Sequence, residues 1–66
     1  MYKFKDREVM KRYKKCEVAK DIGLSKSYFT NVINGKVDCS KLVAYAITKF
    51  LDSEAEIDNY FERVND

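Results

Sequence analysis

Apolar residues recur along this chain at the spacing of an α-helix, and no segment sustains the strict alternation that is typical of a β-strand. One such stripe ends before Gly23 and a second ends before Gly35. The clearest stripe runs from Leu42 to Leu51, a further one follows it, and a looser set lies near the N-terminus. The pattern predicts five short helices, at about 5–13, 15–22, 26–34, 41–51 and 54–64.

Capping residues support the starts of three of these predicted helices. Ser25 precedes the third helix and can accept a hydrogen bond from its free N–H groups. Ser40, or Asp38, stands at the start of the fourth helix, and Ser53 with Glu56 has the spacing of a capping box for the last one. We therefore expect one all-α domain over residues 1–66, folded as a compact five-helix bundle.

Length and composition exclude several function classes. The chain has 66 residues and no His, which removes the commonest general base and metal ligand, and such a small core leaves little room for a substrate pocket. Its two cysteines, Cys16 and Cys39, can form neither a four-ligand zinc site nor a disulfide framework. We therefore expect no enzyme, no catalytic residue, no metal, no cofactor and no small-molecule substrate.

The chain also lacks the apolar runs that a membrane protein or a secreted precursor would need. No run approaches the roughly 18 apolar residues of a membrane span, and the N-terminus MYKFKDREVM has no signal-peptide core. These features predict a cytoplasmic protein that does not contact a membrane.

Charge is distributed unevenly along the chain, although the net charge is only +2. Residues 1–41 contain eleven Lys or Arg and five Asp or Glu, whereas residues 42–66 contain two and six. A basic front followed by an acidic tail indicates that the front meets a polyanion.

The interval between the second and third predicted helices has the form of a helix-turn-helix, over residues 15–34. Ala19 is small enough to let the two helices cross closely, and Gly23 supplies a residue that tolerates positive φ in the turn. The apolar residues expected to hold these helices together are Val18, Ile22, Leu24, Phe29 and Val32.

The stretch Lys15–Lys36, KCEVAKDIGLSKSYFTNVINGK, resembles the helix-turn-helix of the phage Cro and repressor family, the XRE-like regulators. Its segment VAKDIGLSKS is similar to the family core "LA..lG.s.s", and VINGK is similar to the family ending "iENGK". The chain departs from the family at Ile33, where Glu is frequent, and at Lys15, where Gln is frequent. The resemblance implies a lambda-repressor-like DNA-binding domain and a dimeric repressor whose second motif helix, 26–34, enters the major groove at operator half-sites.

The face of helix 26–34 that lies opposite Phe29 and Val32 contains the candidate base contacts. In this docking mode the N-terminal residues of the recognition helix reach base edges. Lys26 can donate to guanine, Ser27 can pair with several bases, and Asn31 can bind adenine through two hydrogen bonds. The resemblance implies the same three positions. Further candidates on this face are Tyr28 and Thr30.

Phosphate contacts are expected from the start of the second predicted helix and from the loop after the third. Lys15 can join the free N–H groups of its helix at a phosphate, and Asn34 and Lys36 are the loop candidates. The basic residues Lys11, Arg12, Lys14 and Lys41 would add to the positive field without fixing the register on DNA.

The last predicted helix is the candidate site of dimer contact. One recognition helix reads only about 4–5 base pairs, so a dimer is expected in order to double the site. The apolar stripe available for this contact consists of Ile57, Tyr60, Phe61 and Val64.

An alternative from another function class remains open. The low net charge and the acidic tail are compatible with a helix-turn-helix scaffold that binds a protein, in the manner of an antitoxin or inhibitor, with weak or no specific DNA binding. The polar outward set of helix 26–34 argues against it, because protein-binding faces usually present aromatic or aliphatic anchors. A repressor, an activator and an accessory DNA-binding protein are not distinguished by these residues.

Overall fold

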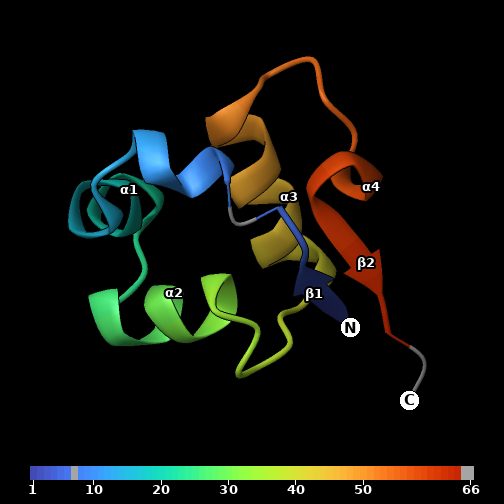
Figure 1. Ribbon diagram of the computed structural model, residues 1–66, viewed down its shortest axis with the longest axis horizontal. Helices are drawn as coiled ribbons and strands as arrows, with labels where there is room; N and C mark the ends of the chain where they lie inside the picture. Colours follow the sequence, from blue (N-terminus) through green and yellow to red (C-terminus); the bar gives the residue numbers. More distant parts are fainter. Residues whose placement is uncertain (7, 65–66) are drawn as a thin grey trace.

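The computed structural model describes residues 1–6 and 8–64, and its helices surround one end of a small sheet (Figure 1). The elements in chain order are β1 (Tyr2–Phe4), a 3-10 helix (Val9–Arg12), α1 (Lys15–Ile22), α2 (Lys26–Ile33), α3 (Lys41–Leu51), α4 (Ile57–Tyr60) and β2 (Phe61–Arg63). The helices α1, α2 and α3 match the three central predicted helices to within one residue.

The prediction of an all-α five-helix bundle is wrong, because the two ends of the described chain form an antiparallel sheet. Phe4 of β1 lies opposite Phe61 of β2, and Tyr2 lies opposite Arg63. On the other edge of β1, Tyr2 exchanges two backbone hydrogen bonds of 2.8 Å with Cys39. The fold is therefore a mixture of helices and a two-stranded sheet, with β1 fixed between β2 and the segment that enters α3.

The alternating direction of the side chains explains why the N-terminal residues form a strand. Tyr2 and Phe4 face the core while Lys3 between them is exposed, which is the two-residue period of a strand. The helix predicted over 5–13 is reduced to the 3-10 helix, with Lys11 N–H donating to the Glu8 carbonyl. Arg7, within the same predicted helix, lies outside the described residues.

The C-terminal correction concerns the helix predicted over 54–64, which is a single turn in the structure. The Ser53 capping box does not form; instead the N–H of Glu56 donates to the side-chain oxygen of Asn59 at 2.8 Å. From Phe61 the backbone is extended, with φ −127° and ψ 150°. The strand is favoured here because Phe61 packs edge-on against Phe4, with ring centroids 5.2 Å apart.

The core lies between the three longer helices and the inner face of the sheet. α1 packs against α2 and α3, while β1 contacts α2 and α3. The fully enclosed side chains of the core include Phe29, Ile47, Thr48, Cys39 and Phe61. Burial raises the pKa of the Cys39 thiol to about 11, so this side chain is a protonated packing group near neutral pH. Among the described residues, no helix is long and apolar enough to span a bilayer.

Candidate nucleic-acid interface

The turn between α1 and α2 is built by a left-handed glycine. Gly23 has a φ of 94°, and the N–H groups of Gly23 and Leu24 both donate to the Ala19 carbonyl, at 2.9 and 2.8 Å. The hydroxyl of Ser25 then accepts from the N–H of Tyr28 at 3.1 Å and caps α2. Three residues thus end one helix and start the next, and the chain reverses sharply between them.

The predicted motif core lies where the sequence places it. Val18, Ala19, Phe29 and Val32 are buried, and Ile22 and Leu24 pack against them. The buried Ala19 lies at the contact of α1 and α2, where a larger side chain would push the helices apart. Because one face of α2 is held in this way, its opposite face has a fixed orientation relative to the rest of the molecule.

The N-terminal part of α2 is its open part. Lys26, Ser27 and Tyr28 are exposed, whereas Thr30 and Asn31 in the next turn are half-buried. Every predicted base-contacting residue therefore lies on α2 with some accessible surface, and accessibility is greatest at the helix start. This graded exposure is what a helix inserted N-terminus first would present to base edges.

The C-terminal end of α2 is closed by a second left-handed glycine. Gly35 has a φ of 76°, its N–H donates to the Val32 carbonyl, and the N–H of Lys36 donates to the Asn31 carbonyl at 2.9 Å. These two hydrogen bonds form a Schellman motif. The motif directs the chain away from the helix axis and leaves Lys36 exposed just beyond the recognition face.

A hollow of about 230 Å³ brings together residues from three parts of the chain, and two of the predicted phosphate contacts line it. Lys15 comes from the first residue of α1, Asn34 from the end of α2, and Lys11 from the 3-10 helix, over a floor of Met10 and Ile33. The N-cap residue of α1, Lys14, makes no side-chain capping hydrogen bond. Two lysines, the Asn34 side chain and the N-terminal end of α1, with its positive helix dipole, thus line one hollow at the end of α2.

Sequence reasoning did not select Lys11 for this site. It counted Lys11 as part of a general positive field, because nothing local in the sequence indicates that the 3-10 helix packs beside the end of α2. The dense run of Lys11, Arg12, Lys14 and Lys15 was the available signal. Lys11 also makes an exposed ion pair of 3.2 Å with Glu8, which leaves its ammonium at the surface.

The candidate dimer residues are dispersed in the structure. Phe61 is 1% exposed and belongs to the core of a single chain. Ile57 and Tyr60 are half-buried on α4, and Val64 follows β2, where its N–H donates to the Met1 carbonyl. These residues do not form one continuous helical stripe, because the helix predicted for them is interrupted after Tyr60.

The part of the chain that the structure describes contains no cluster of metal-ligating side chains. No three His, Cys, Asp or Glu side chains gather among residues 1–6 and 8–64 as a metal ion would require. Comparison of the chain with models of known families, with curated proteins and with solved structures found no match.

Proposed function

We propose that this protein is a sequence-specific DNA-binding regulator of transcription that acts in the cytoplasm, most simply as a Cro-like repressor. In this proposal α2 enters the major groove, and two copies bind the two half-sites of an operator. The observation that supports it best is the exposed polar start of α2, with Lys26 and Ser27, together with the hollow at the other end of the same helix, which Lys11 and Lys15 line.

Each part of this surface has a distinct chemical role in the proposal. Lys26 donates to guanine, and the half-buried amide of Asn31 faces an adenine, where limited side-chain freedom lowers the entropy lost on binding. Lys11, Lys15 and the start of α1 hold a phosphate, which sets the register of the protein without reading sequence. Lys36, just past the left-handed turn, adds a second phosphate contact.

The experiment that tests this function is selection of random duplex DNA by the purified protein at moderate salt, followed by sequencing of the retained DNA. A motif with two-fold symmetry is expected, because two copies would present the same helix to both half-sites. Absence of any enriched motif, with binding lost at physiological salt, would contradict the proposal. That result would favour the protein-interaction alternative.

Asn31→Ala gives a finer test on the selected operator. We expect a loss of about 1–3 kcal/mol in binding free energy and a relaxed preference at one base pair, since the amide would no longer discriminate adenine. Random duplex DNA is the control, and binding to it should change little. Equal weakening on both DNAs would exclude Asn31 as a base-reading residue.

A further inference from the structure

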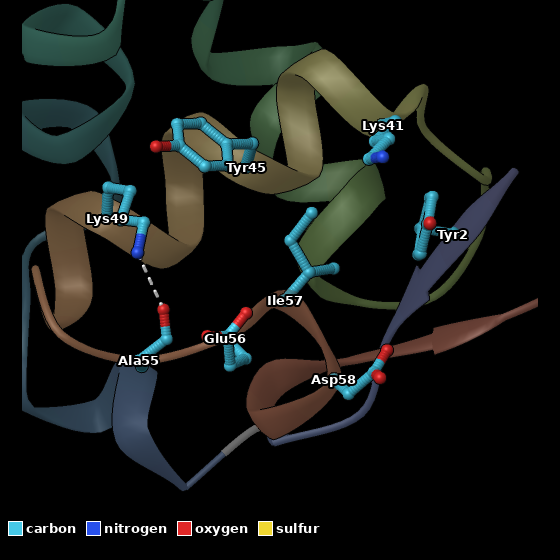
Figure 2. Close-up of a pocket in the computed structure, with 8 residues that line it drawn as sticks. All are labelled: Tyr2, Lys41, Tyr45, Lys49, Ala55, Glu56, Ile57 and Asp58. Atoms are coloured by element: carbon cyan, nitrogen blue, oxygen red, sulfur yellow. Dashed lines mark hydrogen bonds between the residues drawn. The ribbon is translucent and has the colours of Figure 1, made fainter.

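A groove of about 280 Å³ lies between α3 and the segment that enters α4, and no residue of α2 lines it (Figure 2). Lys41, Tyr45 and Lys49 stand along the α3 wall, and Glu56, Ile57 and Asp58 form the opposite wall. Figure 2 shows Ile57 pointing from its wall toward α3, with Tyr2 of β1 near one end of the groove. None of the candidate base or phosphate contacts lines it, and of the residues expected to add to the positive field only Lys41 does.

Large apolar side chains of α3 are exposed, and one of them, Tyr45, lines this groove. Leu42 is 78% exposed and Tyr45 is 51% exposed. They are three residues apart on α3, so they share one helical face. A single exposed leucine is ordinary, but an exposed leucine and an exposed tyrosine on one helical face, the tyrosine also lining the groove, form an apolar surface that another molecule can cover.

The two walls have opposite charge. Lysines stand on the α3 wall and carboxylates on the α4 wall. Lys49 is already occupied, because its ammonium donates to the carbonyls of Ala55 at 2.9 Å and Ser53 at 3.3 Å and lies over the Tyr45 ring. Among the described residues the only ion pair is that of Lys11 with Glu8, so Lys41 and Asp58 have no ion-pair partner in that part of the chain.

We propose that a second copy of this chain docks on this groove through a two-fold symmetric interface. In such an interface each residue pair occurs twice, so one surface must be complementary to itself. A surface with a basic wall and an acidic wall meets that requirement, because Lys41 can approach Asp58 of the partner subunit while Asp58 approaches the partner's Lys41. The apolar centre of the interface is then formed by Leu42 and Tyr45 from both copies.

The position of the groove is compatible with binding of both copies to one DNA, a step that rests on the proposed function. Because α2 does not line the groove, docking there leaves both recognition helices free.

Charge reversal tests this interface, with sedimentation velocity of the full chain as the measurement. The wild type is expected to dimerise, and Lys41→Glu and Asp58→Lys are each expected to weaken the dimer at least about tenfold, because both symmetric contacts become repulsive. A mixture of the two variants should form heterodimers, since both contacts are then attractive again. Lys20→Glu, a change of the same kind on α1, serves as the matched control and should dimerise normally.

The mixing step separates contacts between chains from contacts within one chain. If Lys41 and Asp58 acted only within a chain, mixing two monomeric variants would restore nothing. A mixture that stays monomeric, single variants that dimerise like the wild type, or a wild type that is monomeric at high concentration would each overturn the proposal. Leu42→Ser should also weaken the dimer about tenfold or more, and circular dichroism should remain unchanged because this side chain is exposed in the single chain.

The failure of this interface and the failure of the DNA-binding proposal give different results. A wild type that is monomeric free and on DNA, yet selects a half-site, contradicts the interface alone. If the variants and their mixture behave as expected of the dimer but the wild type enriches no DNA motif, the result contradicts the DNA-binding function alone. If the wild type selects an operator with two-fold symmetry and the charge-reversal variants bind that operator as single copies, the result supports both the interface and the DNA-binding function.

Discussion

The pairing of Phe4 with Phe61 provides the most direct test of the sheet that closes this fold. Phe4 is 3% exposed, Phe61 is 1% exposed, and their rings meet edge to face at 5.2 Å. Truncation to alanine would cost about 3–5 kcal/mol, which is comparable to the whole stability expected of a domain this size. Replacement by leucine is the better perturbation, because it removes the ring contact and keeps an apolar side chain.

Each single substitution, Phe4→Leu or Phe61→Leu, should lower the free energy of unfolding by about 1–3 kcal/mol. The informative quantity is the coupling between them, because an aromatic pair contributes about 0.5–1.5 kcal/mol beyond the area it buries. We therefore expect the double variant to be less destabilised than the sum of the single variants by about that amount. Urea unfolding followed by far-ultraviolet circular dichroism measures all four proteins of the cycle.

The control cycle combines Phe4→Leu with Phe50→Leu, since Phe50 contacts Tyr13 on another side of the molecule. These two changes should add to within about 0.5 kcal/mol, as expected of distant sites. If Phe4 and Phe61 were equally additive, their rings would not be in contact, and the register that places β1 against β2 would be refuted.

Three further predictions concern the candidate interface, the turn between α1 and α2, and the buried Cys39 thiol. Lys11→Ala and Lys15→Ala should each weaken binding to all DNA sequences alike and reduce the slope of log K against log salt by about 0.9; an unchanged slope would remove that lysine from the phosphate contacts. Gly23→Ala should cost about 1–2 kcal/mol in urea unfolding because of its φ of 94°, although no atom lies within 4 Å of the added Cβ; a neutral result would mean that the turn relaxes. Between pH 9 and 11 the unfolded chain releases the Cys39 proton while the folded chain retains it, so stability should fall by about 2 kcal/mol. Cys39→Ala should lack this component when unfolding is measured across that pH range, and an equal decline in both proteins would assign it to other groups.

The central helices could be predicted because every signal for them is local. The apolar stripes of α1 to α3 repeat within each helix, and their ends are marked by residues that act on their own backbone neighbours. Ser25 and Ser40 accept from N–H groups three residues ahead, and Gly23 and Gly35 adopt the left-handed conformation that ends a helix. The tertiary packing is consistent with the helices that these residues favour locally.

The ends of the chain could not be predicted for the opposite reason. A three-residue strand such as Tyr2–Phe4 is too short to show a sustained alternation, and its stability depends on a partner almost the full chain away. The apolar positions near residue 60 satisfy a helical period and also suit one turn followed by a strand. Only the contact of Phe61 with Phe4 decides between them.

The same difference between local and long-range signals separates the two parts of the candidate site. The exposed face of α2 follows from its own period once Phe29 and Val32 face inward, so its residues could be chosen from the sequence. The hollow at Lys11, Lys15 and Asn34 depends on how a 3-10 helix packs beside the end of another helix, and no local pattern encodes that arrangement.

The distribution of charge explains how a chain with a net charge of only +2 can be proposed to bind a polyanion. Electrostatic attraction depends on the local field rather than on the total charge. The lysines of the hollow lie where the 3-10 helix and α1 meet the end of α2, whereas Glu56 and Asp58 line the groove beside α3, to which α2 contributes no residue. Because the sheet fixes the acidic segment in that position, its carboxylates are held away from the surface proposed to meet phosphate and remain available to the lysines of a second copy.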